Sequence, residues 1–233
     1  MITVQPIVYA EDVVDWHRVA SGIGLRLDAE PDVVWAEADG DGILAIHRVD
    51  AGDALAGTVE ACVLVDDVDA AAAALTSLGV AIERTMLDDI GPMLRVTSAE
   101  GVRLTITGGA RPARDGLVVQ PIWYQRDLDE PRRILEALGL RGTIASDAGT
   151  WIELAADGGG VVALHRSTST VGVELAFATH DVDGCASGMR ERGLHADVVD
   201  EAYDRTVRTP SPAGGELWIN GPIDMHGYHR LDV

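Results

Sequence analysis

The sequence predicts an α+β protein of four βαβββ modules in two similar domains, because it contains an internal repeat with a regular order of elements. The segment VQPIVY at residues 4–9 returns as VQPIWY at residues 119–124. Farther along each copy, LAIHR at 44–48 is matched by VALHR at 162–166. The repeated unit is roughly 110 residues long, which is enough for each copy to form a domain.

The first half of each copy reads as a strand, a helix and a β-hairpin. In the first copy, residues 3–9 alternate and are rich in β-branched side chains, which predicts a strand. Residues 12–21 place apolar side chains three positions apart behind an Asp N-cap and before a glycine stop, which predicts a helix. Strands are expected at 33–38 and 43–49, joined by a turn at 39–42.

The second half of each copy repeats this order. In the first copy, a strand at 59–65 leads into a helix at 67–79, and strands follow around 80–84, 92–97 and 102–107.

Domain boundaries follow from the repeat and from one Arg- and Pro-containing linker. The segment 111–116 is the convincing linker between the copies. We therefore expect one domain over 1–110, a second over 117–223, and a C-terminal tail over 224–233 that lies outside the repeat.

The composition indicates a chain that can bury two cores and that avoids anionic partners. Of its 233 residues, 47% are hydrophobic, and 38 acidic residues outnumber 18 basic ones for a formal charge of −20. Such a surface is repelled by phosphate backbones and by anionic lipids, so neither nucleic acid nor a membrane is expected as a partner. Every basic residue is Arg, a bias that resembles the usage of GC-rich bacterial genomes.

The cysteines and the N-terminus predict a cytoplasmic protein. Cys62 and Cys185 do not occupy equivalent positions of the repeat, so free thiols in a reducing compartment are expected. The N-terminus has no basic region followed by a long apolar stretch, which argues against a signal peptide or a membrane span. A monomer or a homodimer is expected.

Four motifs, present in both copies, resemble the vicinal oxygen chelate superfamily, which includes glyoxalase I, bleomycin-resistance proteins and extradiol dioxygenases. They are the strand-then-Asp start, the hairpin strand ending in His-Arg, the strand-to-helix entry, and a final hairpin similar to the superfamily's D-P-x-G pattern. In this sequence they read PIVYAED and PIWYQRD, LAIHR and VALHR, VDDVDAAAAAL and THDVDGCASGM, and SAEGVRLTI and SPAGGELWI. The resemblance implies two glyoxalase-like domains, each an open barrel with a ligand cavity.

The resemblance also locates the positions at which metal-using members of the superfamily take their four ligands. These positions hold Gln5, Ala45, Glu60 and Thr105 in the first copy, and Gln120, Ala163, Glu174 and Trp218 in the second. At least two of the four ligands are missing in each domain, which argues against the superfamily's usual metal chemistry.

Two histidines leave a metal-binding alternative open. His47 and His165 lie two residues beyond the alanine positions and therefore point to the same face of the sheet. A Gln–His–Glu set could supply three ligands for a divalent ion, from Gln5, His47 and Glu60 or from Gln120, His165 and Glu174. The other interpretations are a rim histidine that hydrogen-bonds a loop and a histidine that contacts a ligand.

Glu60 and Glu174 interrupt apolar strands, so each is expected to face a cavity or to pair with an arginine. Arg95 and Arg208 recur at matching strand positions and are the expected partners. The carboxylates would then form structural bridges, or one of them would act as a general base.

Aromatic side chains complete the candidates for ligand contact, which also include Gln5, His47, Arg95, Gln120, His165 and Arg208. Four tryptophans are expected on strands, and two tyrosines share the face of Gln5 and Gln120. They are Trp35, Trp123, Trp151, Trp218, Tyr9 and Tyr124. They would stack on a planar ligand, above all in the second copy, or else pack in the core.

The sequence therefore predicts a cytosolic protein that binds an aromatic or natural-product ligand in a domain cavity, without a cofactor. The alternative is a lyase, isomerase or dioxygenase-like enzyme that uses the Gln–His–Glu set with a divalent metal. A third reading is a duplicate in which one degenerate domain supports the other. The second copy is where we expect the cavity.

Overall fold

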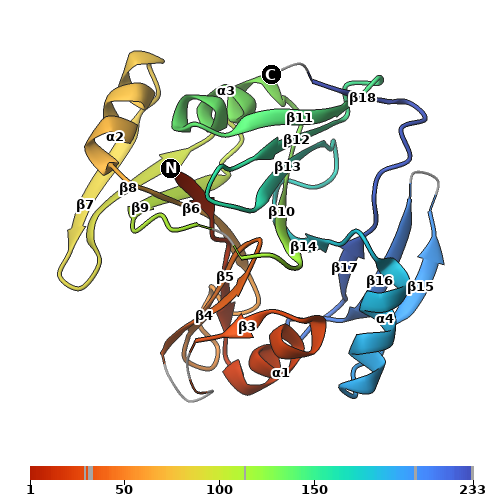
Figure 1. The fold of residues 1–233 in the computed structure, drawn as a ribbon. Coiled ribbons are helices and arrows are strands. Elements are labelled where there is room, and N and C mark those ends of the chain that lie inside the picture. Colours follow the sequence, from red (N-terminus) through yellow and green to blue (C-terminus); the bar gives the residue numbers. More distant parts are fainter. Residues whose placement is uncertain (29, 31–33, 113, 202–203, 232–233) are drawn as a thin grey trace.

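The structure, a computed structural model, describes residues 1–28, 30, 34–112, 114–201 and 204–231. Within these residues, four helices and two nine-stranded sheets form an α+β fold (Figure 1). None of the helices described is long and apolar enough to cross a bilayer.

The elements of the first domain follow the predicted order closely. They are β1 (Ile2–Val4), β2 (Ile7–Ala10), α1 (Val13–Ile23), β3 (Arg26–Leu27), β4 (Trp35–Gly40), β5 (Gly42–Arg48), β6 (Val59–Val65), α2 (Val68–Ser77), β7 (Ile82–Leu87), β8 (Gly91–Thr97) and β9 (Arg103–Gly108). The strand expected at 3–9 is interrupted at Gln5 and Pro6. Val33, the first residue of the strand expected at 33–38, lies outside the described residues.

The second domain repeats this order and adds a strand from the tail. Its elements are β10 (Val118–Gln125), α3 (Asp129–Leu138), β11 (Arg141–Ser146), β12 (Trp151–Ala155), β13 (Val161–Arg166), β14 (Gly172–Ala178), α4 (Val182–Glu191), β15 (Asp197–Asp200), β16 (Arg205–Pro210), β17 (Glu216–Asn220) and β18 (Tyr228–Arg230). β18 pairs with β11, so this part of the tail returns to the edge of the second sheet.

Each sheet joins two modules at its centre. The strand order is β3-β4-β5-β2-β6-β9-β8-β7 in the first domain, where β1 also pairs with β6, and β15-β16-β17-β14-β10-β13-β12-β11-β18 in the second. The central pairs, β2 with β6 and β10 with β14, are antiparallel, whereas β2 and β10 run parallel to β5 and β13. The predicted fold of four modules in two open domains is confirmed.

The helix starts show why local sequence predicted these elements well. Asp12 accepts hydrogen bonds from the backbone of Val14 and Asp15 at the start of α1, and Gly24 ends the helix at a φ of 104°. Asp67 caps α2 in the same way. Because these caps satisfy the amides that a helix leaves free, they fix its first turn from neighbouring residues alone.

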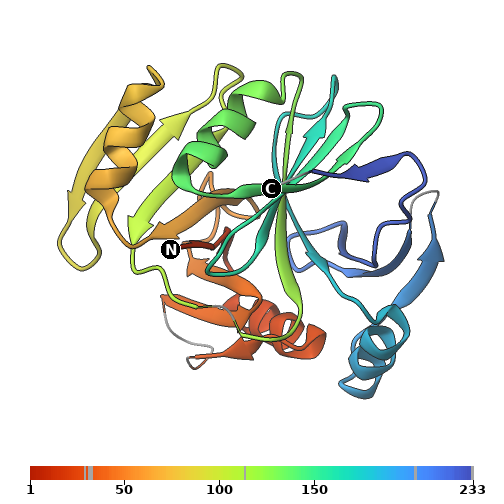
Figure 2. The same ribbon diagram turned by 45° about the horizontal axis from the view of Figure 1, so that its top comes forward.

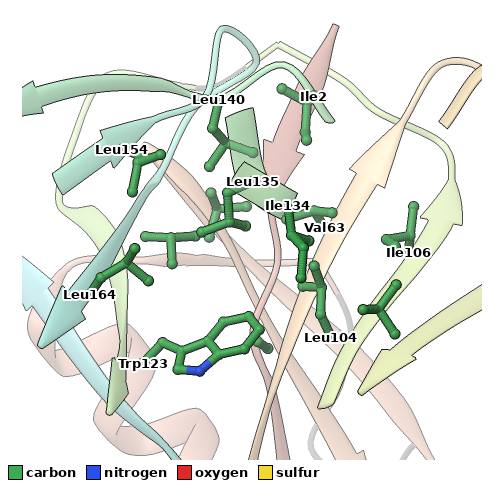
Figure 3. Close-up of a cluster of buried hydrophobic side chains, with 14 of the residues drawn as sticks. Ile2, Val63, Leu104, Ile106, Trp123, Ile134, Leu135, Leu140, Leu154 and Leu164 are labelled. Carbon is green, nitrogen blue, oxygen red and sulfur yellow. The ribbon is translucent and has the colours of Figure 1, made fainter. Parts of the chain in front are cut away.

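The two domains share their cores instead of packing as separate units. Each module is named here by its helix. One core combines the α1 module with the α4 module. The other, shown in Figure 3, combines the α2 module with the α3 module. Accordingly, α2 packs against α3, and α1 packs against α4 (Figure 2). The opposite face of each sheet carries a smaller apolar cluster, which includes Tyr9 in the first domain and Ile122 in the second.

The turn between β4 and β5 meets the turn between β12 and β13 where the domains join. The expected turn at 39–42 is tighter than predicted, with Asp41 alone between β4 and β5. Asp41 accepts a hydrogen bond from the backbone of Gly160 at 2.9 Å. A Cβ on Gly42, whose φ is 94°, would lie 2.9 Å from the Cα of Gly160, so the close approach of the two turns requires glycine there.

Candidate functional site

The second domain contains a cavity of about 1220 Å³ on the face of its sheet that points away from the helices. The strands β10, β12, β13, β14 and β17 supply most of its lining, and residues of the tail and of the first domain supply the rest, the latter being Trp16, Asp41, Gly57, Thr58 and Val59. Among the lining residues are Gln120, Ile122, Tyr124, Trp151, Glu153, His165, Glu174, Ala176, Trp218, Asn220 and Tyr228.

Glu153 is the central acidic group of this cavity. Strand alternation puts Trp151 and Glu153 on the same face of β12. The Oε1 atom of Glu153 accepts hydrogen bonds from Gln120 Nε2 at 3.1 Å and from Trp151 Nε1 at 3.3 Å. Burial raises the pKa of the Glu153 carboxyl, and these two hydrogen bonds oppose that rise. Among the described residues, its Oε2 atom has no hydrogen-bond partner.

A chain of hydrogen bonds fixes the orientation of Gln120. Its amide oxygen accepts from Asn220 Nδ2 at 3.2 Å, so its amide nitrogen points to Glu153. The oxygen of Asn220 lies 3.5 Å from the hydroxyl of Thr206, which lies 2.8 Å from Asp204 Oδ1. Since a hydroxyl carries one proton, Thr206 donates to only one of these two acceptors at a time.

Asp204 ends this chain in a desolvated position. Its side chain lines the cavity and is 9% exposed. Its Oδ2 atom is buried without a hydrogen-bond partner in the part of the chain described. Burial raises the pKa of Asp204 to about 6.

His165 lies between two aromatic rings of the cavity. Its ring centroid is 5.1 Å from that of Tyr124 and 5.7 Å from that of Trp151, in edge-to-face contacts. Burial lowers the pKa of His165, which favours the neutral imidazole. Its Nδ1 atom is buried and has no hydrogen-bond partner among the residues described.

The same constellation occurs in the first domain. Glu37 Oε1 accepts from Gln5 Nε2 at 2.7 Å and from Trp35 Nε1 at 3.4 Å. His47 lies 5.4 Å from Tyr9 and 5.6 Å from Trp35, measured between ring centroids. The repeat in sequence is therefore a repeat of side-chain geometry.

The first domain differs because the linker enters its site. Arg111 Nη2 lies 2.6 Å from Glu37 Oε2 and 2.7 Å from Asp39 Oδ1. Arg114 also contacts Asp39, at 2.9 Å. These arginines come from the predicted linker at 111–116, of which residue 113 lies outside the described residues.

Glu37 and Glu153 are not among the site residues predicted above, although the sequence carries a signal for them. Trp35-Ala36-Glu37 is matched by Trp151-Ile152-Glu153 in the repeat. Alternation places each Glu on the face of its Trp, so two acidic residues recur on the cavity side of equivalent strands.

The predicted catalytic residues occupy different environments. Glu60 is buried and accepts hydrogen bonds from Tyr9 at 3.1 Å and from the hydroxyl of Thr105. Glu174 is exposed and lines the cavity. Neither side chain holds the central position that Glu37 and Glu153 hold.

The predicted pairing of Glu60 with Arg95 and of Glu174 with Arg208 is wrong. The arginine near Glu60 is Arg103, at 4.0 Å, and Arg208 pairs with Glu216 at 3.3 Å. Arg95 lies opposite Thr105, which lies opposite Cys62 and not opposite Glu60. Arg95 is therefore aligned with Cys62, two residues along β6 from Glu60, which explains why the first pair does not form.

Trp123 does not line the cavity, contrary to expectation. It is fully buried in the core shared by the α2 and α3 modules, where its Nε1 donates to Gln125 Oε1 at 2.9 Å (Figure 3). Ile122 and Tyr124 point into the cavity, so Trp123 between them must point to the helices. Trp218 does line the cavity, with the guanidinium of Arg208 5.7 Å from its ring centroid.

The side chains at the superfamily's metal positions do not fit a divalent ion in the second domain. The amide oxygen of Gln120 is used by Asn220, and Trp218 offers only an N–H donor where a carboxylate is needed. Ala163 supplies no donor atom. Nor do the described residues contain three or more His, Cys, Asp or Glu side chains grouped to hold a metal.

The sheet order and the paired modules define the fold of the vicinal oxygen chelate superfamily, so the resemblance seen in the sequence is confirmed at the level of the fold. The chain is similar in structure to a catechol 2,3-dioxygenase, with a TM-score of 0.61 and 14% identity over 95% of this chain and 87% of the other. It is also similar to the 2,3-dioxygenase LapB from Pseudomonas sp. KL28, with a TM-score of 0.62 and 16% identity over 98% and 94%.

A third similar structure is homoprotocatechuate 2,3-dioxygenase from Arthrobacter globiformis, with a TM-score of 0.59 and 16% identity over 95% of this chain and 79% of the other. Searches with family models and among curated proteins found no match. At these identities the likeness establishes the fold and leaves the activity to the residues of the site.

Proposed function

We propose that the cavity of the second domain binds a small planar aromatic molecule without the help of a metal ion. The observation that carries this proposal is a cavity of about 1220 Å³ with aromatic walls and a polar floor. Ligand pockets are typically roughly 300–1,000 Å³ and combine apolar walls with a few fixed polar groups. Trp151, Trp218, Tyr124 and Tyr228 supply the aromatic lining, and Glu153 belongs to the polar part of the lining, here called the floor.

The polar groups of the floor suit a ligand that donates hydrogen bonds. Among the described residues Glu153 Oε2 has no hydrogen-bond partner, while Gln120 and Trp151 hold the other oxygen in place. The ring of His165, between Tyr124 and Trp151, also lines the cavity. Because the surrounding hydrogen bonds fix these groups before a ligand arrives, little side-chain entropy is lost on binding.

Paired tryptophan variants test this proposal, because the repeat supplies a matched control. Trp151→Ala removes a cavity wall, and Trp35→Ala removes its counterpart in the first domain. With catechol and 1-naphthol as probes in calorimetric titrations, Trp151→Ala is expected to weaken binding about tenfold, the loss of roughly 1.4 kcal/mol of aromatic contact. Trp35→Ala is expected to leave binding unchanged. If neither catechol nor 1-naphthol binds, or if the two variants lose affinity equally, the proposal is overturned.

A second candidate function is metal-dependent dioxygenase-like chemistry, which is favoured by the fold that the chain shares with extradiol dioxygenases. The side chains of Gln120, Ala163 and Trp218 argue against this function, because none of them offers a free oxygen or nitrogen acceptor to a metal ion. Incubation with Fe²⁺ and catechol in air distinguishes the two: ring-cleavage product that disappears in Gln120→Ala would favour the enzyme.

A further inference from the structure

Each domain contains one site in which a glutamate is held by a glutamine and a tryptophan, here called the Gln–Glu–Trp site. It consists of Gln5, Trp35 and Glu37 in the first domain and of Gln120, Trp151 and Glu153 in the second. In both sites the same oxygen, Oε1, receives both hydrogen bonds, which leaves Oε2 for another partner.

In the first domain the partner is a guanidinium group from the chain itself. Arg111 Nη2 lies 2.6 Å from Glu37 Oε2 and forms an ion pair with it. The same nitrogen lies 2.7 Å from Asp39 Oδ1. The first domain thus shows that a guanidinium fits beside the glutamate of this site, with Asp39 as a second carboxylate where the second domain has Ala155.

In the described part of the second domain, no arginine takes the position that Arg111 has in the first. Arg111 comes three residues after Gly108 at the end of β9, and the residue three positions after the matching Gly221 is Asp224. Among the described residues, no cation contacts Glu153 Oε2. The site instead opens into the cavity, whose lining includes Glu153.

The charge of the cavity favours a cation in that position. Among the described residues, its lining contains five carboxylates and one arginine, Arg230, and one of the five, Glu216, pairs with Arg208 at 3.3 Å. The carboxylates are those of Asp41, Glu153, Glu174, Asp204 and Glu216. Asp204 is more than nine-tenths buried, and its Oδ2 atom has no hydrogen-bond partner among the described residues, so a cation in the cavity would also stabilise this desolvated carboxylate. Aromatic rings beside the acids add cation–π attraction.

We infer that the ligand of the second domain carries a planar cationic group, a guanidinium or an amidinium, which binds Glu153 Oε2 as Arg111 binds Glu37. This inference rests on the proposed function and specifies the ligand's chemistry. The aromatic part of the ligand lies against Trp151 and Trp218, while the cation reaches the floor. The first domain is closed to such a ligand because its own linker fills the site.

The test compares phenylguanidine with phenylurea, two planar molecules of nearly equal shape that differ in charge. In calorimetric titrations of the full chain, phenylguanidine is expected to bind at least about tenfold more tightly, as for a hydrogen bond to a charged group. Glu153→Gln, which keeps the side-chain volume, is expected to abolish that preference. The matched control Glu37→Gln, checked by circular dichroism for its fold, is expected to retain it.

The outcomes separate this inference from the proposed function. If phenylurea and neutral aromatics bind but phenylguanidine has no advantage, the inference is wrong and the proposed function stands. A preference that survives in Glu153→Gln also overturns the inference, because the cation is then held elsewhere. If no aromatic compound binds, both are wrong.

Discussion

The contact between Arg111 and Glu37 gives the most specific prediction about stability. Arg111 bridges two carboxylates whose side chains are only 17% and 11% exposed, those of Glu37 and Asp39. Arg111→Met keeps most of the aliphatic stem and removes the charge. Both carboxylates then remain desolvated, and only Asp39 keeps an arginine, Arg114 at 2.9 Å.

The expected loss follows from these distances and exposures. Hydrogen bonds to charged groups contribute about 1.5–3 kcal/mol, and loss of one partner of a fully buried pair costs about 3–5 kcal/mol. Because Arg111 is 40% exposed and Arg114 remains, we expect the lower range, about 2 kcal/mol. For a chain of 233 residues this corresponds to a fall in Tm of about 4–8 °C.

Urea unfolding, followed by circular dichroism, measures this loss. The control is Arg18→Met, which removes an exposed ion pair with Asp15 at 3.1 Å and should cost less than about 1 kcal/mol. In the double variant Arg111→Met/Glu37→Gln, the second change should recover about 1 kcal/mol, since the unpaired charge is gone. If Arg111→Met costs no more than Arg18→Met, or if the two changes are simply additive, the linker does not bind the first domain's site as described.

Three further predictions concern the shared core and the acids of the cavity. Phe177→Ala should cost about 3–5 kcal/mol, and because Phe177 lies in a core shared by both domains, urea unfolding should remain a single transition; two separate transitions would contradict the shared core. Asp204 has its pKa raised to about 6 by burial, so the folded chain binds more protons than the unfolded chain between about pH 4 and 6, and stability falls as the pH rises through that range. Asp204→Asn should therefore stabilise the chain at pH 7, by an amount on the order of 1–3 kcal/mol, and have little effect at pH 4, whereas an effect independent of pH would refute the desolvation of Asp204. Burial also raises the pKa of Glu153, which faces Gln120 and Trp151 and lies near Asp204 and Tyr228, so phenylguanidine should bind more weakly as acid protonates Glu153; calorimetry across pH 4–8 should show this in the natural chain and not in Glu153→Gln.

The sequence was sufficient to predict the local elements and the fold class, because both depend on neighbouring residues and on the repeat. Helix α1 begins beside Asp12 and ends at Gly24, as its capping residues indicate. The hairpin at Gly40–Gly42 and the recurrence of His47 as His165 are likewise visible in the sequence.

What the sequence did not show depends on contacts between distant strands. The face on which Trp123 lies follows from alternation with Tyr124, but its burial depends on the core that the two domains share. Glu37 and Glu153 repeat in the sequence, yet nothing local indicates that Arg111 binds only the first. The return of the tail as β18, which brings Tyr228 to the cavity, depends on pairing with β11.

The central claim is that the second domain's cavity holds an aromatic cation at Glu153, and a crystal structure of the chain with phenylguanidine tests it most directly. We expect the guanidinium about 2.7–2.9 Å from Glu153 Oε2, with the ring against Trp151, and Arg111 still bound to Glu37. Phenylguanidine bound in the first domain in place of Arg111, or bound in the cavity away from Glu153, would contradict the account.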